Sequence, residues 1–197
     1  MKTETHNDNN KVEKKFIGRT ADNIHVYIIE NNQHMLAHTD VSEELLTEAI
    51  QKVTFGLENN ERIITVDMGR IIGKQACVET TADDKVVEAK RPGRKKASRI
   101  VCNRDPVPTS KLTLGFSIKR EDGLLTVYTA YPGERAPMEL TDYKYKRLSP
   151  EEQARIRMFW DTHALCSIST YGTHEPPAEA IVKPKTIDSN EEIRQEQ

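Results

Sequence analysis

Cysteines and long hydrophobic runs are scarce in this chain. Its 197 residues include three cysteines, an odd number at wide spacing, which excludes a disulfide framework and indicates small buried side chains in a reducing compartment. No apolar stretch approaches the roughly 20 residues that a membrane-spanning helix needs. The charged residues at the start are not followed by a hydrophobic segment, so we expect no secretory signal. These absences predict a cytoplasmic protein with no membrane partner.

The short motifs of the common metal and nucleotide sites are also missing. There is no CxxC, no HExxH, no Walker loop, no GxGxxG after a strand and no GxSxG elbow. His34 and His38 are four residues apart and would share one face of a helix, but zinc needs a third and usually a fourth ligand. We therefore predict neither a metal nor a cofactor.

The net charge of −2 argues against a simple nucleic-acid binder, but the cations are unevenly distributed. Residues 85–99 hold seven cations and one acid, which are Lys85, Lys90, Arg91, Arg94, Lys95, Lys96 and Arg99, and Glu88. A basic segment inside an acidic chain attracts phosphates locally. An ordinary solvated loop has the same composition, so the charge pattern alone leaves both interpretations open.

Hydrophobic periodicity predicts one folded domain between two solvated tails. Residues 1–14 and the acidic residues 173–197 are polar and without periodicity, which is typical of disorder. Residues 15–172 hold several strand patterns and two amphipathic helices. The first helix follows a cap at Asp40, and the second begins at Ser149-Pro150 with a glutamate three residues after the serine. We therefore predict an α+β fold in which helices pack against an antiparallel β-meander sheet.

The strongest strand pattern is a meander over residues 98–131. Residues 111–119 alternate between apolar and polar side chains, and Asp122-Gly123 is a strong hairpin signal that connects them to residues 124–131. Residues 98–103 complete the pattern as a third strand. The alternation predicts a sheet with one apolar side and one polar side.

The polar side of this predicted meander is the candidate binding surface. Its hydroxyl and cationic residues come from all three strands and are Arg99, Thr113, Ser117, Lys119, Thr126, Tyr128, Thr129 and Tyr131. A guanidinium group holds a phosphate through two hydrogen bonds, and hydroxyls donate to its non-bridging oxygens. An ordinary solvent-facing sheet carries the same residue types, so this second interpretation also stays open.

Two histidines are candidates for proton transfer, because imidazole titrates near neutral pH. His163 lies among apolar residues, which is typical of a packing residue. His38 lies just before the first helix, where a side chain can reach over a sheet edge. We therefore favour His38 as the catalytic residue.

The order of several short motifs resembles the BECR group of nucleases, which unites barnase, EndoU, the colicin-type tRNA nucleases and RelE. The motifs are His38-Thr39-Asp40-Val41, Met68-Gly69-Arg70-Ile71-Ile72-Gly73-Lys74, Ala89-Lys90-Arg91-Pro92-Gly93-Arg94, Ser98-Arg99-Ile100-Val101, Lys111 to Ile118, and Thr129-Ala130-Tyr131-Pro132-Gly133. They fall within residues 34 to 166. The similarity looks closest to uncharacterised members carried by prophages and mobile elements.

The resemblance implies a metal-independent, toxin-like ribonuclease. In such enzymes a base removes the proton of a ribose 2′-OH, and the oxygen attacks the adjacent phosphate to leave a 2′,3′-cyclic phosphate. Carried over to this chain, His38 is the base or acid and Arg99 stabilises the phosphate. Thr129 and Tyr131 supply hydroxyls on the terminal strand. The candidate substrate-binding residues are Arg94, Ser117 and Lys119. The acidic net charge departs from the strongly basic free toxins of this group.

Two other functions agree with the same patterns. A non-catalytic module would bind RNA or another protein on the same face, so binding to phosphate would weaken with salt while no product formed. A plain small domain would leave the polar face merely solvated. RNA is the partner that we expect, and an inhibitor or immunity protein is the second candidate.

Overall fold

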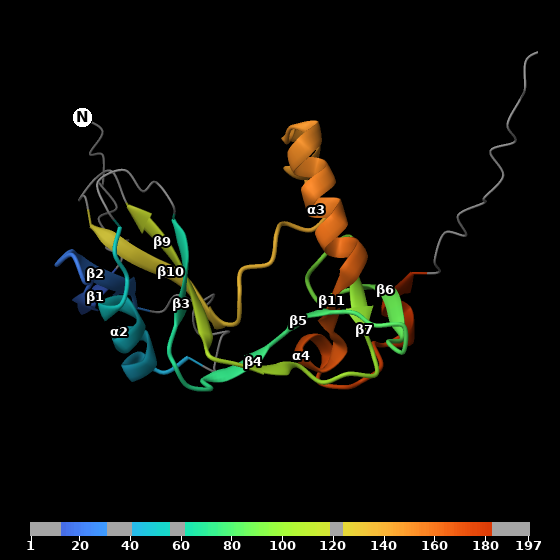
Figure 1. The fold of residues 1–197 in the computed structure, drawn as a ribbon, viewed down its shortest axis with the longest axis horizontal. Helices are drawn as coiled ribbons and strands as arrows, with labels where there is room; N and C mark the ends of the chain where they lie inside the picture. The colour runs from blue at the N-terminus through green and yellow to red at the C-terminus, as the bar shows by residue number, and fades with distance from the viewer. Residues whose placement is uncertain (1–12, 31–40, 56–61, 119–123, 183–197) are drawn as a thin grey trace, which may run out of the picture. The chain divides into compact units, whose positions relative to one another are not determined.

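A computed structural model describes residues 13–30, 41–55, 62–118 and 124–182 (Figure 1). These residues form a mixed α/β structure with three α-helices and several sheets. The contacts divide the chain into two compact units, residues 1–75 with 107–136 and residues 76–106 with 137–197. We describe each unit by itself. The predicted domain limits at residues 15 and 172 stay a prediction, and residues 1–12 and 183–197 of the predicted tails lie outside the described residues.

The first unit is built on a five-stranded sheet. Its strands, in spatial order, are β1 (Lys14–Arg19), β2 (His25–Ile29), β10 (Leu125–Pro132), β9 (Lys111–Ile118) and β3 (Ile63–Asp67). All neighbours are antiparallel except β2 and β10, which are parallel. A separate two-stranded sheet pairs β4 (Gly73–Gln75) with β8 (Val107–Thr109).

Helix α2 (Glu43–Gln51) packs on one side of this sheet (Figure 1). The Ser42 hydroxyl accepts the backbone N–H of Leu45 and so caps the helix, two residues after the predicted cap Asp40, which lies outside the described residues. Leu46, Ala49 and Ile50 form the buried stripe of the helix. The helix therefore forms at the predicted place because its apolar residues recur with the helical period.

Strand β9 supplies the centre of the core beneath α2. Leu112, Leu114 and Phe116 are at most 1% exposed and belong to one hydrophobic cluster with the buried face of α2. Burial of each such side chain stabilises the fold by about 1.5–3 kcal/mol. The side chains of β9 between these three residues lie on the opposite side of the sheet, which confirms the predicted alternation.

We call the side of the first sheet opposite α2 the polar face. Its polar residues are Thr65, Asp67, Lys111, Thr113, Ser117, Thr126, Thr129 and Tyr131. Alternation is interrupted in β10, where a bulge lies between Val127 and Thr129. The bulge leaves Tyr128 as an extra residue, and its ring lies over Gly115 of β9. Gly115 thus provides the room that an aromatic ring needs on this face.

We expect Gly115→Ala to lower the free energy of unfolding by about 1–3 kcal/mol, measured by urea denaturation. The added methyl carbon would lie 2.6 Å from the Thr129 methyl group and 2.7 Å from the Tyr128 ring. Gly18→Ala in β1 is the matched control, because its methyl carbon would lie 3.6 Å from the nearest atom, in Thr47. Equal stability of the two variants would contradict this packing.

The second unit is built on another five-stranded sheet. Its strands, in spatial order, are β12 (Ile181–Val182), β6 (Val86–Lys90), β7 (Ala97–Val101), β11 (His163–Cys166) and β5 (Cys77–Glu79). Its helices are η1 (Tyr145–Arg147), α3 (Pro150–Thr162), α4 (Ser167–Tyr171) and η2 (Ala178–Ala180). Neighbouring strands are antiparallel except β7 and β11.

Helix α3 begins at the predicted residue. The Ser149 hydroxyl accepts the Glu152 backbone N–H at 3.2 Å, and the Glu152 carboxylate accepts the Ser149 backbone N–H at 3.1 Å. Pro150 occupies the first position, where its missing N–H costs nothing. Ile156 and Trp160 are the buried residues of α3, and the Trp160 indole donates to the Met138 carbonyl. The capping box is therefore confirmed.

The predicted meander of three strands is wrong in one respect. Residues 97–101 form β7, whose neighbours are β6 and β11 of the second sheet, while β9 and β10 belong to the first sheet. The intervening β8 pairs with β4 instead of continuing the meander. Similarly, β12 pairs with β6 in a segment for which the sequence predicts no regular structure. Periodicity identifies strands, but it does not identify their partners.

All three cysteines are free and buried, as predicted. Burial raises the pKa of the Cys77 thiol to about 12 and that of the Cys166 thiol to about 11, so both stay neutral at physiological pH. Cys102 also has a raised pKa because of burial. In the described part of the chain, no helix combines the length and the apolar character needed to span a membrane.

Candidate functional site

The polar face of the first sheet is the candidate site. Its middle is occupied by hydroxyl groups that bond across the strands. The Thr113 hydroxyl donates to the Gly133 carbonyl at 2.7 Å and lies 2.8 Å from the Thr65 hydroxyl. Since a hydroxyl has only one hydrogen, Thr65 is the donor in the second bond. Farther along the strands, the Ser117 and Thr126 hydroxyls bond at 2.9 Å. The face thus carries two separate sets of hydroxyl groups that hydrogen-bond across the strands.

Tyr131 adjoins this network and has an altered acidity. Its side chain is hydrogen-bonded to Thr113, which is its cross-strand partner on β9. Burial raises the pKa of the Tyr131 phenol above its ordinary value of 10.0. The phenol therefore stays protonated at neutral pH, so it can donate a hydrogen bond but cannot act as a base.

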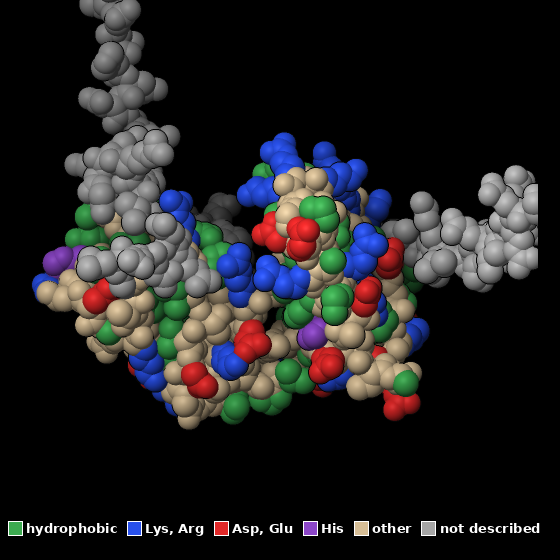
Figure 2. All heavy atoms as spheres, turned by 45° about the horizontal axis from the view of Figure 1, so that its top comes forward, with side chains coloured by type: hydrophobic (Ala, Val, Ile, Leu, Met, Phe, Trp, Pro, Cys, Tyr) green, Lys and Arg blue, Asp and Glu red, His purple; other side chains and the backbone are tan. Residues whose placement is uncertain are grey.

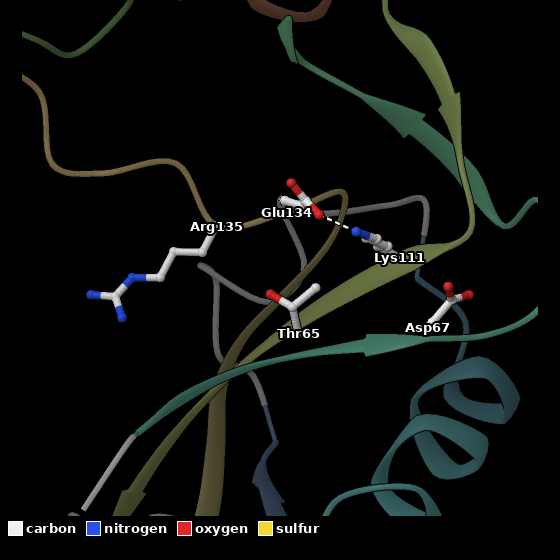
Figure 3. Close-up of a pocket in the computed structure, with 5 residues that line it drawn as sticks. All are labelled: Thr65, Asp67, Lys111, Glu134 and Arg135. Atoms are coloured by element: carbon white, nitrogen blue, oxygen red, sulfur yellow. Dashed lines mark hydrogen bonds and ion pairs between the residues drawn. The ribbon is translucent and has the colours of Figure 1, made fainter. Parts of the chain in front are cut away.

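A pocket of about 490 Å³ opens at one end of the polar face (Figure 3). Its lining residues are Thr65, Asp67, Lys111, Glu134 and Arg135. The first two come from β3 and Lys111 begins β9, where it is the cross-strand partner of Asp67. Glu134 and Arg135 follow the end of β10, and the Glu134 backbone N–H donates to the Gln75 side chain at 2.9 Å. The pocket thus draws side chains from two adjoining strands, β3 and β9, and from the segment that follows β10.

The pocket holds two cations and two carboxylates, of which Lys111 and Glu134 form an ion pair. This contact (Figure 3) raises the pKa of the Lys111 ammonium. The Gly69 backbone N–H donates to Asp67 at 2.8 Å and, together with the Ser110 hydroxyl, lowers the pKa of the Asp67 carboxyl. Both groups are therefore charged near neutral pH. The Arg135 side chain extends away from the Lys111–Glu134 pair (Figure 3).

This arrangement suits an anion that also exchanges a proton. Lysine and arginine can hold phosphate oxygens. A carboxylate beside them can accept a proton from a substrate hydroxyl. Among the described residues, no group of three or more His, Cys, Asp or Glu side chains could hold a metal ion.

Three predicted site residues lie on the polar face. Thr129 is buried opposite Gly115, and Tyr131 lies opposite Thr113. Ser117 is half-buried and bonds to Thr126. The predicted arrangement of hydroxyls on one face of β9 and β10 is therefore confirmed, whereas the catalytic and binding roles of these residues stay predictions.

Arg94 and Arg99 lie in the second unit, on or beside β7. The predicted placement of Arg99 in the same sheet as Thr129 is wrong, because β7 pairs with β6 and β11. The Arg99 guanidinium donates to the Asp161 carbonyl at 3.0 Å, near the C-terminal end of α3, where a cation is stabilising. Its Nε atom is buried and has no hydrogen-bond partner in the described part of the chain. Arg94 is exposed in the turn that follows β6.

Two predicted residues, His38 and Lys119, lie outside the described residues. His163 stacks on Phe159, with ring centroids 3.9 Å apart and an interplanar angle of 13°. Its Nδ1 atom lies 3.0 Å from the Phe159 carbonyl oxygen. These contacts agree with the packing role that the sequence predicts for His163.

None of the pocket residues is among the site residues that the sequence predicts. Lys111 continues the alternation of Thr113 and Ser117, so the pattern that identified the polar face also contained it. Asp67 could not be found in this way, because its place beside Lys111 depends on the pairing of β3 with β9. Glu134 follows the turn at Pro132-Gly133, where alternation no longer predicts the side of the sheet on which a side chain lies.

The second unit carries a separate basic surface. Lys and Arg side chains gather around α3 (Figure 2). The exposed cations of this segment are Lys144, just before η1, Lys146 and Arg147 in η1, and Arg155 and Arg157 in α3. Lys144 and Arg147 each lie 5.7 Å from the centre of the Tyr143 ring. This surface holds cations, but it has neither the hydroxyl network nor the pocket described for the polar face.

No protein-family model, curated protein or solved structure matches the chain. The resemblance to the BECR nucleases therefore stays a prediction that rests on short motifs. The function has to be argued from the geometry of the polar face and its pocket.

We expect Thr113→Val to lower the free energy of unfolding by about 1–3 kcal/mol, measured by urea denaturation. Valine has the shape of threonine, but it removes the bond to the Gly133 carbonyl and the bond from Thr65. Thr65→Val is the matched control. It should lower the free energy of unfolding by less, because Thr65 is exposed and water can replace its hydrogen-bond partner. An equal loss in both variants would contradict a central role for Thr113.

Proposed function

We propose that the polar face of the first sheet binds RNA and that the pocket at its end holds a phosphate. One observation carries this proposal. Lys111 and Arg135 line one pocket together with the Thr65 hydroxyl, beside a sheet face rich in hydroxyls. Two cations can hold the non-bridging oxygens of a phosphodiester. The remaining hydroxyls of the face can contact ribose and further phosphates.

The layout of the first unit supports the same proposal. A helix covers one side of a largely antiparallel sheet, and α2 is the only helix among the described residues of this unit. The BECR resemblance implies helices packed against a four-stranded antiparallel sheet, with the active site on its open face. The parallel pairing of β2 with β10 and the fifth strand depart from the four-stranded antiparallel sheet of that group.

Cleavage of the bound RNA is the second proposed function, and the position of Glu134 favours it. The Glu134 carboxylate lies in the same pocket as both cations, so it can take the proton of a ribose 2′-OH. The resulting oxygen attacks the adjacent phosphorus, and the bond to the 5′-oxygen breaks to leave a 2′,3′-cyclic phosphate. Lys111 and Arg135 stabilise the negative charge on the phosphorane that forms before this bond breaks. Tyr131 stays protonated and is a candidate proton donor to the leaving oxygen.

Incubation with total RNA in EDTA, followed by mapping of the cleaved ends, separates the two functions. A nuclease of this type leaves cyclic phosphates without a metal, and Glu134→Gln should lower its rate roughly 100- to 10,000-fold. Binding without any product would support the non-catalytic module and overturn cleavage. Cleavage that is unaffected by Glu134→Gln and by His38→Ala would overturn both assignments of the base.

We expect Lys111→Ala combined with Arg135→Ala to weaken RNA binding and to lower its salt dependence. Each lost phosphate contact reduces the slope of log K against log salt by about 0.7 for a single strand, so the pair should reduce it by about 1.4. Fluorescence anisotropy at several salt concentrations measures both quantities. Arg70→Ala is the matched control, because this exposed cation pairs with Glu48 of α2 and does not line the pocket. Equal effects of the control and the double variant would contradict the proposal.

A further inference from the structure

Three aromatic rings form a cluster on the polar face, at the opposite end from the pocket. Phe16 of β1 contacts His25 and Tyr27 of β2, with ring centroids 5.5 and 5.7 Å apart and interplanar angles of 69° and 70°. Tyr27 is the register partner of Thr126, and the Thr126 hydroxyl bonds to Ser117 of the polar face. We call Phe16, His25 and Tyr27 the ring cluster.

The ring cluster is not buried by the protein. Phe16 is 48% exposed although Ile17, the next residue, is 6% exposed in the core. His25 is exposed and Tyr27 is half-buried. β1 is the edge strand of the sheet, so no strand of the described residues lies beside it on the side away from β2. An exposed phenylalanine beside two further rings indicates a surface for another flat apolar group.

The charges around the ring cluster favour an anionic occupant. Arg19 is the cross-strand partner of His25, and its guanidinium donates to the Asn23 amide oxygen at 2.8 Å. Arg19 forms no ion pair with a carboxylate in the described part of the chain, so its charge is not neutralised there. Lys14 lies two residues before Phe16 on the same strand, where alternation places it on the same side.

A path of suitable groups connects the ring cluster to the pocket. The Tyr128 ring lies over Gly115, between the two ends of the face. Ser117, near the cluster, and Lys111, in the pocket, are six residues apart on β9, which is about 20 Å of extended strand. A chain of several nucleotides is therefore needed to occupy both ends at once.

From these observations we infer that the ring cluster stacks unpaired bases, so that the RNA bound by this face is single-stranded. This inference rests on the proposed RNA binding. Bases in a duplex are paired and stacked on one another, and the grooves of RNA duplexes are read mainly through shape, phosphates and 2′-hydroxyls. Exposed aromatic rings next to cations instead match the stacking surfaces of single-strand binders. Phe16 provides the most exposed ring, and Arg19 contacts the adjoining phosphate.

The test measures binding of a fluorescent ten-nucleotide RNA by anisotropy, as a single strand and as a duplex. A 2′-O-methyl backbone prevents cleavage because it has no free 2′-OH. We expect the single strand to bind at least tenfold more tightly than the duplex. Phe16→Leu should weaken single-strand binding roughly 5- to 160-fold, the range for loss of one stacked base. It should leave duplex binding unchanged.

Two matched variants separate stacking from general apolar contact. Phe16→Tyr keeps the ring and should retain the affinity of the unmodified protein. Ile24→Ala removes another exposed apolar side chain, 39% exposed and just before β2, and should also leave binding unchanged. Photocrosslinking of 5-iodouridine RNA to the unmodified protein provides a measurement that needs no variant. Crosslinks should map to Phe16 or Tyr27.

The outcomes distinguish the inference from the proposed function. If neither RNA binds, the proposed function and the inference are both overturned. If strand and duplex bind equally and Phe16→Leu changes nothing, the inference alone fails. In that case the double variant of Lys111 and Arg135 still weakens both complexes. Crosslinks confined to the second unit would also overturn the inference.

Discussion

The double pairing of β9 is the constraint on which the first unit depends. This strand bonds to β10 on one side and to β3 on the other, so its register is set by both neighbours. A shift of one residue would exchange Leu114 and Phe116 with Thr113 and Gly115. The hydrophobic cluster beneath α2 therefore fixes the positions of the polar side chains as well. Core packing and the candidate site are two consequences of the same register.

The polar face combines two kinds of group with different binding chemistry. Cations and hydroxyls at the pocket end match phosphate and ribose, while the ring cluster offers flat apolar surface. The first set alone fits many anions, and the second alone fits many apolar partners. A nucleic acid strand carries both features in a fixed repeat. The distribution of these groups along one face is thus more specific than either set of residues.

Local patterns predict those parts of the fold whose signals lie within a few residues. The alternation along β9 and the capping box at Ser149 agree with the structure because backbone geometry dictates both. The partners of β7 depend on segments far away in the chain, so the sequence placed Arg99 in the wrong sheet. The pocket could not be predicted for the same reason, since Asp67 and Glu134 reach Lys111 only through strand pairing and a turn.

The bulge in β10 allows the polar face to change without a change in the hydrophobic core. Leu125, Val127 and Ala130 all point into the cluster beneath α2, although their spacing is two and then three residues. The register of β10 with β9 passes from Val127 to Thr129 and leaves out Tyr128. The residues of β10 before and after it would therefore keep their orientation if it were absent. Deletion of Tyr128 would therefore remove an aromatic ring from the polar face without repacking the interior. The polar face can thus be altered at this point while the hydrophobic core stays unchanged.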